Sequence, residues 1–195
     1  MNDATEILRT DRLRLRLYGP GDAEWMHALY RQDSVARYLL EGPWSAEDAE
    51  ERLRERRERT GLDTEAKALA MVVEHEGVPV GDVSLWWTDA DHRIVEIGWV
   101  LDPAHAGHGF ASEAVSAALA LAFGTYRAHR VAAQMDARNT RSAALAERVG
   151  MTREAHLRQD WWSKGEWTDT VIFGALGTDD PHASITKKNS LSPVS

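Results

Sequence analysis

Residues 96–114, EIGWVLDPAHAGHGFASEA, decide the fold of this chain. A strand that begins near residue 93 ends at Leu101, and Pro103 prevents further sheet pairing because proline has no backbone N–H to donate. A short loop with glycines at positions 107 and 109 follows. The alanine-rich segment after this loop is typical of a helix that can lie very close to a sheet. We therefore expect a strand, a glycine-spaced loop and a helix in direct succession.

This loop has the features of an anion-binding site. Gly107 and Gly109 leave their backbone N–H groups approachable, and the first turn of the helix directs its unpaired N–H groups at the same point. A phosphate or diphosphate would fit there, although glycines before a helix are also common as simple turn residues. Together with Asp136 the two glycines partly resemble a dinucleotide-binding fingerprint. Such a domain should begin with its glycine loop, whereas about half of this chain precedes it, so the architecture argues against that alternative.

The sequence on both sides of this stretch predicts an α+β fold. Short polar links between the middle strands indicate an antiparallel meander, and one strand–helix–strand crossover follows it. Ser45 to Asp48 has the form of a capping box at a helix start, and Asp22 is suited to cap an earlier helix that contains Trp25, Met26 and Leu29. Strands are expected at 13–18, 68–74, 79–87, 93–101, 130–135, 152–161 and 168–176, and further helices at 46–59, 111–123 and 140–149.

The composition is that of an ordinary globular protein in which residues 1–177 form one domain. Residues 178–195 are polar without an apolar period and predict a disordered tail. The 31 acidic and 23 basic residues give a formal net charge of −8, which argues against a nucleic-acid partner and favours a cationic substrate. The absence of cysteine excludes disulfides, thiolate metal sites and a cysteine nucleophile. With no signal peptide and no apolar run near the ~20 residues that span a bilayer, we expect a soluble cytoplasmic protein without a membrane partner.

From Leu8 to Leu176 the chain resembles the GNAT superfamily of N-acetyltransferases, in particular its Rim-type branch of ribosomal-protein N-terminal acetyltransferases. The pyrophosphate loop of the family, Gln/Arg-x-x-Gly-x-Gly/Ala, falls on residues 106–111, with Ala106 in the place of Gln or Arg. Residues 139–151 resemble the second motif of that branch, and residues 158–176 its C-terminal hairpin. The resemblance implies a single-domain GNAT fold with a mixed, mostly antiparallel sheet, helices on both faces and a splayed central strand pair.

The same resemblance implies acetyl-CoA as co-substrate and suggests which residues bind it. The backbone N–H groups near the end of the central strand would contact the pantetheine arm and the thioester oxygen. Asn139 would bind the pantetheine or place the thioester, and its position before Thr140 suits a helix N-cap equally well. The predicted acetyl-CoA site consists of Trp99, Val100, Ala106, Gly107, His108, Gly109, Phe110, Ala111 and Asn139.

Two side chains are candidates for the chemistry. Glu96 lies on the strand that leads to the loop, where the resemblance implies a general base; a carboxylate on an exposed strand face is an equally good reading. Gly98 is two residues further and should leave space beside it. Ser142 resembles the serine that serves the leaving thiolate in Rim-type enzymes. Ala146 occupies the place where many relatives carry a tyrosine acid, so that group is missing here.

The acceptor side of the site is less well defined by the sequence. Asp160 is a candidate carboxylate for the positive charge of the acceptor, and Trp87, Trp161 and Tyr38 are candidates for the surrounding wall. His105 and His108 are spaced like metal ligands without a third partner, and we expect no metal. The acceptor remains open between a protein N-terminus and a small amine such as an aminoglycoside-like drug or a polyamine. A non-catalytic CoA-binding sensor is the alternative function, and the chain is expected to be a monomer or a homodimer.

Overall fold

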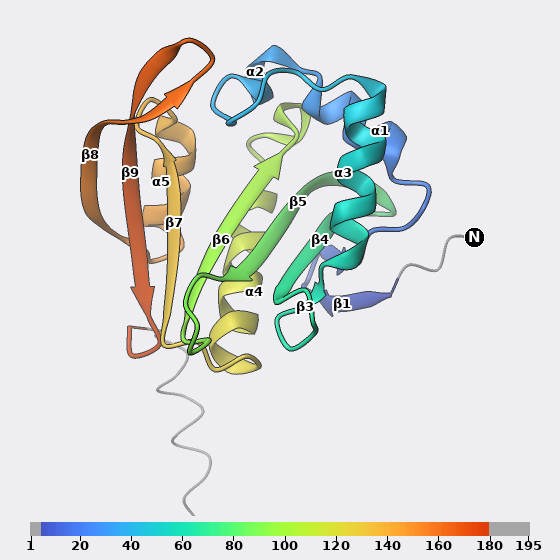
Figure 1. Cartoon of the computed structure of the whole chain (residues 1–195). Coiled ribbons are helices and arrows are strands. Elements are labelled where there is room, and N and C mark those ends of the chain that lie inside the picture. The colour runs from blue at the N-terminus through green and yellow to red at the C-terminus, as the bar shows by residue number, and fades with distance from the viewer. Residues whose placement is uncertain (1–4, 180–195) are drawn as a thin grey trace, which may run out of the picture.

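A nine-stranded sheet extends through the computed structural model, which describes residues 5–179 (Figure 1). The strand order is β1-β2-β4-β5-β6-β7-β9-β8, with β3 paired to the end of β4. The strands are β1 (Glu6–Arg9), β2 (Leu13–Arg16), β3 (Thr60–Gly61), β4 (Ala68–His75), β5 (Val78–Trp87), β6 (Ile94–Leu101), β7 (Arg130–Asp136), β8 (Thr152–Ser163) and β9 (Glu166–Leu176). The helices are α1 (Ala23–Tyr30), α2 (Asp33–Ala36), α3 (Ala46–Glu58), α4 (Phe110–Gly124) and α5 (Thr140–Arg148), with a 3-10 turn at Pro103–His105.

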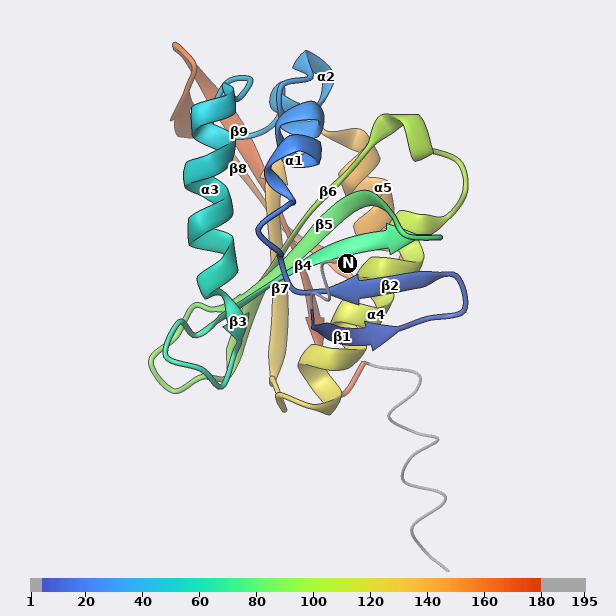
Figure 2. The ribbon, with the colours of Figure 1, turned by 90° about the vertical axis from the view of Figure 1, so that its right-hand side faces the viewer.

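Helices cover both faces of the sheet, as the sequence predicts (Figure 2). The larger core lies between the sheet and the helices α4 and α5, and the smaller one lies under α1 and α3. Ala114, Ala118 and Ala122 of α4 are fully buried, so their small side chains allow this helix to approach the strands closely. Every predicted strand and helix is present, with boundaries that differ by a few residues at most.

The central strands β6 and β7 are splayed. They pair in parallel over three positions only, from Ile94–Arg130 to Glu96–Ala132. Beyond Glu96, β6 stays paired with β5 and β7 stays paired with β9, and Figure 1 shows the two strands diverging. The prediction of a splayed central pair is therefore confirmed.

The expected cap at Asp22 is wrong. Asp22 precedes α1, but its side chain makes no capping hydrogen bond and instead accepts two from the buried Arg16, at 2.7 and 2.8 Å. Glu74 bonds the other side of the same guanidinium at 2.6 Å. Burial raises the pKa of Asp22, but the hydrogen bonds that it accepts, including the one from Arg16, outweigh this effect and lower the pKa below its ordinary value. A buried cation needs such partners, and this need outweighs the cap.

Three elements escaped prediction because they are short, namely β1, α2 and β3. Residues 1–4 and 180–195 lie outside the described part of the chain, so the predicted disordered tail is described only at Thr178 and Asp179. The domain boundary at residue 177 stays a prediction.

The capping box of α3 provides a test of helix stability. Ser45 Oγ accepts the backbone N–H of Asp48 at 3.1 Å, and the carboxylate of Asp48 accepts the N–H of Ser45 at 2.8 Å. Ser45→Ala should lower the free energy of unfolding by about 1 kcal/mol in urea titrations, because the Asp48 N–H in the first turn loses its side-chain acceptor. Ser116→Ala on the exposed face of α4 is the control and should not destabilise the protein. Equal effects of both variants would contradict the cap assignment.

Candidate active site

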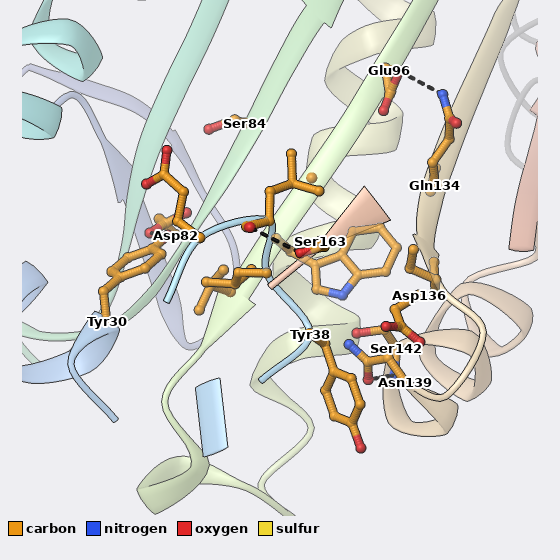
Figure 3. A pocket seen from close by; sticks show the side chains of 18 of the residues that line it. Tyr30, Tyr38, Asp82, Ser84, Glu96, Gln134, Asp136, Asn139, Ser142 and Ser163 are labelled. Carbon is orange, nitrogen blue, oxygen red and sulfur yellow. Dashed lines mark hydrogen bonds between the residues drawn. The ribbon is translucent and has the colours of Figure 1, made fainter. Parts of the chain in front are cut away.

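A cleft of about 670 Å³ opens where β6 and β7 diverge. Its walls come from these two strands, from α3, from the segment after α2 and from the turn between β8 and β9. Figure 3 shows Glu96 on β6 against Gln134 of β7, with Asn139 and Ser142 side by side beyond the end of β7. The splay therefore gathers seven of the fifteen predicted site residues around one cavity, and the loop at residues 106–111 is not among those that line it.

Glu96 is the half-buried carboxylate at the point where the two strands part. Its Oε2 accepts a hydrogen bond from Gln134 Nε2 at 3.1 Å, and no other side-chain bond to it is present in the described structure. Burial raises the pKa of Glu96, and the bond from Gln134 offsets only part of this effect. A carboxylate with a raised pKa is a stronger base than a solvated one.

The space expected beside Gly98 is filled. A Cβ at this position would meet the Trp86 ring at 3.3 Å, so the missing side chain makes room for the indole and not for a ligand. Trp86 pairs with Glu96 across β5 and β6 and lines the cleft with it. Trp86 therefore forms the wall next to the carboxylate.

The backbone of β6 presents amides to the gap. Thr88 N–H bonds Ile94 C=O, and Asp102 N–H bonds Val80 C=O, so the even-numbered residues of β6 direct their backbone groups toward β5. Since these groups alternate along a strand, the N–H groups of Trp99 and Leu101 point toward the open side. The prediction that the Trp99 N–H contacts the pantetheine arm or the thioester oxygen is compatible with this geometry. The N–H of Val100 points to β5, so Val100 lines the cleft through its side chain.

The loop before α4 has the geometry of an anion cradle. Gly107 and Gly109 both have left-handed backbones, with φ of +84° and +79°, and no atom lies within 4 Å of a Cβ placed on Gly107. Gly109 is the N-cap of α4, so the backbone N–H groups of Phe110 and Ala111 are at the helix start, where they have no intrahelical partner. These residues fit the diphosphate of coenzyme A.

Sequence reasoning missed the residue that braces this loop. Arg12, between β1 and β2, donates to the backbone oxygen of His108 at 2.8 Å and forms a 2.6 Å ion pair with Glu113 of α4. Its guanidinium also lies over the ring of Phe110, 5.1 Å from the centroid. Burial would raise the pKa of Glu113, but hydrogen bonds from Thr10 and Arg12 lower it. These contacts hold the loop against the first turn of α4.

The exposed His108 contacts its own loop. His108 Nδ1 lies 3.1 Å from the carbonyl oxygen of Ala106, and its ring stacks on Phe110. His105 ends the 3-10 turn that precedes this loop. Within residues 5–179, no group of three or more His, Asp or Glu side chains is arranged to hold a metal ion.

The start of α5 contributes two polar side chains to the cleft. Asn139 is the N-cap, and its Oδ1 accepts the backbone N–H of Ser142 at 3.1 Å. The capping interpretation is therefore confirmed, and both side chains also line the cleft. Ala146, one turn further, is fully buried in the main core and does not reach the cleft. Residues 142 and 146 are four positions apart on α5, but of the two only Ser142 lines the cleft.

Two of the four candidates for the acceptor wall lie in the cleft. Tyr38 and Trp161 line it, and Trp161 is 47% exposed. The prediction that Trp87 belongs to this wall is wrong. Its side chain points to the opposite face of β5 and donates its Nε1–H to the backbone oxygen of Leu62 at 3.0 Å. The prediction that Asp160 faces the acceptor is also wrong, because Asp160 does not line the cleft. Its carboxylate accepts the backbone N–H of Thr170 at 3.0 Å, which ties a bulge between β8 and β9.

A clasp closes the acceptor end of the cleft. Lys164, in the turn between β8 and β9, donates to the backbone oxygens of Ala36, Arg37 and Leu39 at 2.8 to 2.9 Å. Ser163 adds a bond to the Leu40 carbonyl at 3.1 Å (Figure 3). This clasp, Ser163 and Lys164 with the carbonyls of residues 36–40, joins segments more than 120 positions apart. No periodic pattern in the sequence predicts this clasp.

Residues 12–152 match the acetyltransferase (GNAT) domain family. The chain belongs to the GNAT acetyltransferases. It is 30% identical over 172 residues to the uncharacterized N-acetyltransferase YoaA of Bacillus subtilis, covering 87% of this chain and 96% of that protein. It is 25% identical over 158 residues to the spermidine N(1)-acetyltransferase of Vibrio cholerae, covering 81% and 89%.

Among solved structures, the ribosomal L7/L12 α-N-protein acetyltransferase RimL in complex with coenzyme A is similar in fold. The TM-score is 0.77 at 18% identity, with 88% of this chain and 97% of that chain covered. This GNAT chain is accordingly an acetyl-CoA-dependent N-acetyltransferase, and acetyl-CoA is its co-substrate. The relatives place it in the superfamily, with Rim-type and spermidine enzymes at comparable distance. No helix of residues 5–179 has the length and hydropathy needed to cross a bilayer.

The cradle can be tested at Gly109 by calorimetric titration with coenzyme A. Gly109→Val should raise the dissociation constant about tenfold or more, because a β-branched residue resists the left-handed backbone and a Cβ there already lies 3.4 Å from Arg12 Nη2. Gly124→Val at the other end of α4 is the matched control, since it has open space and no positive φ. Unchanged affinity in Gly109→Val would remove the loop from the binding site.

Proposed function

We propose that this GNAT enzyme transfers the acetyl group by direct attack of a primary amine on acetyl-CoA, with both substrates bound together. The observation that carries the proposal is the position of Glu96. A half-buried carboxylate with a raised pKa lies where β6 leaves β7, on the same cleft as Asn139 and Ser142. Acceptor and thioester can meet in this cleft without a covalent enzyme intermediate.

Glu96 serves as the general base. An ammonium group must lose a proton before its nitrogen can attack, and Glu96 accepts this proton directly or through one water. The negative charge that develops on the thioester oxygen needs a donor, and the N–H groups of Trp99 and Leu101 on the open edge of β6 provide it. Both groups are fixed by the sheet, so little reorganisation is needed during the reaction.

The hydroxyl of Ser142 assists the departure of the coenzyme A thiolate. Ser142 resembles the serine of the Rim-type pattern and lines the cleft on the first turn of α5. Its backbone is held by the Asn139 cap, so its hydroxyl starts from a fixed position. The coenzyme A thiolate is a fairly good leaving group near neutral pH, and the hydroxyl therefore assists departure without being indispensable.

The acceptor is a primary amine, either a small molecule or the α-amine of a polypeptide. The competing function, a CoA-binding sensor without catalysis, rests on the alanine at position 146. The presence of Glu96 and Ser142 on one cleft favours the enzyme. Acetyl-CoA turnover with a panel of small amines and short peptides separates the two functions.

Replacing the base tests the mechanism. Glu96→Gln should lower kcat about a hundredfold or more with little change in acetyl-CoA affinity, because the amide cannot accept the proton. The ratio of the wild-type rate to the variant rate should decrease as the pH falls through the pKa of Glu96, because protonated Glu96 cannot accept a proton. Burial raises this pKa above 4.5. Steady-state rates between pH 5 and 9 measure this ratio. A constant ratio near one would mean that the amine arrives neutral and needs no base.

The role of Ser142 is tested separately. Ser142→Ala should lower kcat about tenfold to a hundredfold, a smaller loss than at Glu96, because thiolate departure does not require an acid. An acyl donor with a more acidic thiol should recover most of this loss, since its leaving group needs less assistance. Thr140→Ala, on the same turn and outside the cleft, is the control. If Ser142→Ala kept the full rate, no side-chain acid would act in this enzyme.

A further inference from the structure

The cleft contains nearly equal numbers of positive and negative side chains. Its described wall carries six cationic groups and five carboxylates, although the whole chain is acidic. The cations are Arg37, Arg52, Arg56, Arg59, Arg138 and Lys164, and the carboxylates are Glu41, Glu55, Asp82, Glu96 and Asp136. Which of these charges remain available to a ligand depends on how they pair with one another.

The deepest pair is fully engaged. Arg56 Nη1 lies 2.6 Å from Asp82 Oδ2, and the same guanidinium donates to the hydroxyls of Tyr18 and Tyr30. Its plane also contacts the rings of Tyr18, Tyr30 and Trp44, with centroid distances of 4.9 to 5.6 Å. Tyr30 donates a further bond to Asp82 at 2.6 Å. Both bonds fall on Oδ2, and Arg56 neutralises the charge of Asp82, so this carboxylate is a weaker site for a substrate ammonium than one without an arginine partner.

The remaining wall carboxylates, apart from Glu96, are paired as well. Arg52 bonds both Glu41 and Glu55, the latter at 3.0 Å, and Arg59 lies 3.9 Å from Glu55. On the other wall, Arg138 holds Asp136 at 2.7 Å. Burial would raise the pKa of Asp136, but the hydrogen bonds from Arg138 lower it.

Two opposite charges are left over. Glu96 has only the neutral amide of Gln134 as a side-chain partner. Arg37 has no carboxylate within ion-pair distance in the described structure, and its guanidinium lies 5.4 Å from the centre of the Tyr38 ring. Lys164 is cationic, but its three N–H bonds are used by three carbonyl oxygens. One of these is the carbonyl of Arg37 itself, so the exposed guanidinium extends from a backbone that the clasp holds in place.

We infer that the acceptor of this enzyme carries one primary amine and, at its other end, an anionic group such as a carboxylate or phosphate that binds Arg37. This inference rests on the proposed function and names the substrate class of the same cleft. Glu96 receives the ammonium end, and Figure 3 shows Tyr38, the neighbour of Arg37, well apart from Glu96 in the cleft. A guanidinium recognises both anionic groups through paired charge-assisted hydrogen bonds.

The same arrangement disfavours polyamines. A second ammonium group would have to lie near Arg37, or displace an arginine from a carboxylate that it already neutralises. Neither position offers a free anion, and like charges in a cleft repel. The overall negative charge of the chain suggests a cationic acceptor such as a polyamine. The described cleft wall does not share this negative charge, because its cations and carboxylates are nearly equal in number, so it favours a different acceptor.

The decisive experiment compares three matched acceptor series with the wild-type enzyme. The first is a series of ω-amino acids with two to six carbons between amine and carboxylate. The second is the corresponding ω-amino amides, and the third is the diamines of equal length. At the best length, kcat/KM should follow the order carboxylate, amide, diamine, with the carboxylate about tenfold above the amide, which is typical of a charge-assisted hydrogen-bonded pair.

The variants then assign this preference to one side chain. Arg37→Gln should reduce the carboxylate-to-amide ratio of kcat/KM to about one, mainly through KM, since Arg37 does not touch the reacting atoms. Arg37→Glu should invert the order and make the diamine the better acceptor. Arg31→Gln is the matched control, because Arg31 is an exposed arginine at the end of α1 outside the cleft and its loss changes the net charge equally.

The outcomes separate this inference from the proposed function. Diamines that match or exceed the amino acids in the wild type would overturn it, as would an unchanged ratio in Arg37→Gln or an equal loss in Arg31→Gln. In each of these cases acetyl transfer itself stands. An enzyme that acetylates none of the three series, and no peptide, would instead remove the proposed function and the acceptor class with it.

Discussion

The parting of β6 from β7 is the constraint on which the rest of the site depends. β7 keeps seven paired positions with β9, and β6 keeps seven with β5, so each central strand follows its own outer partner. Between them only three pairs remain. Two half-sheets that twist independently must separate on one side, and that separation frees backbone amides in the middle of a folded domain. The cleft, the free amides of Trp99 and Leu101 and the exposed edge of Glu96 all result from this one break in pairing.

Two parts of the site are held by different means. At the glycine loop, the proposed diphosphate site, buried alanines let α4 lie close to the sheet, and Arg12 ties the loop to Glu113 over short distances. At the turn between β8 and β9, the clasp of Lys164 and Ser163 holds a segment with little regular structure through its carbonyls. Helix packing and an ion pair therefore hold the part proposed for the co-substrate, and hydrogen bonds to a loop hold the part proposed for the acceptor.

Local patterns in the sequence were sufficient to predict the elements. The alternation of β2, the capping box at Ser45 and the glycine loop each depend on neighbouring residues, and the structure has all three. The shared location of Glu96, Asn139 and Ser142 on one cleft followed from the resemblance to the GNAT family, which assigns all three to one site. Even the N-cap at Asn139 follows from its place before the helix.

What could not be predicted depends on how separate elements meet in the fold. Trp86 and Trp87 are adjacent, and only the register of β5 against β6 decides which of them faces the cleft. Asp22 looks like a cap until Arg16 is seen to be buried and in need of a carboxylate. Asp160 looks free until the bulge between β8 and β9 brings it to the Thr170 amide. In each case a contact with another element determines where the side chain lies and outweighs its local preference.

The pairing of charges in the cleft links proton transfer to acceptor choice. An arginine beside a carboxylate stabilises its ionised form and weakens it as a base, and at Asp136 this effect exceeds that of burial. Glu96 has no such partner, and burial raises its pKa. In the described wall, Glu96 is the carboxylate without an arginine partner, and the proposed mechanism uses it as the base. Because the other wall carboxylates are paired with arginines, they attract an ammonium group less than Glu96 does, so the same pairing of charges favours binding of the amine beside the proposed base.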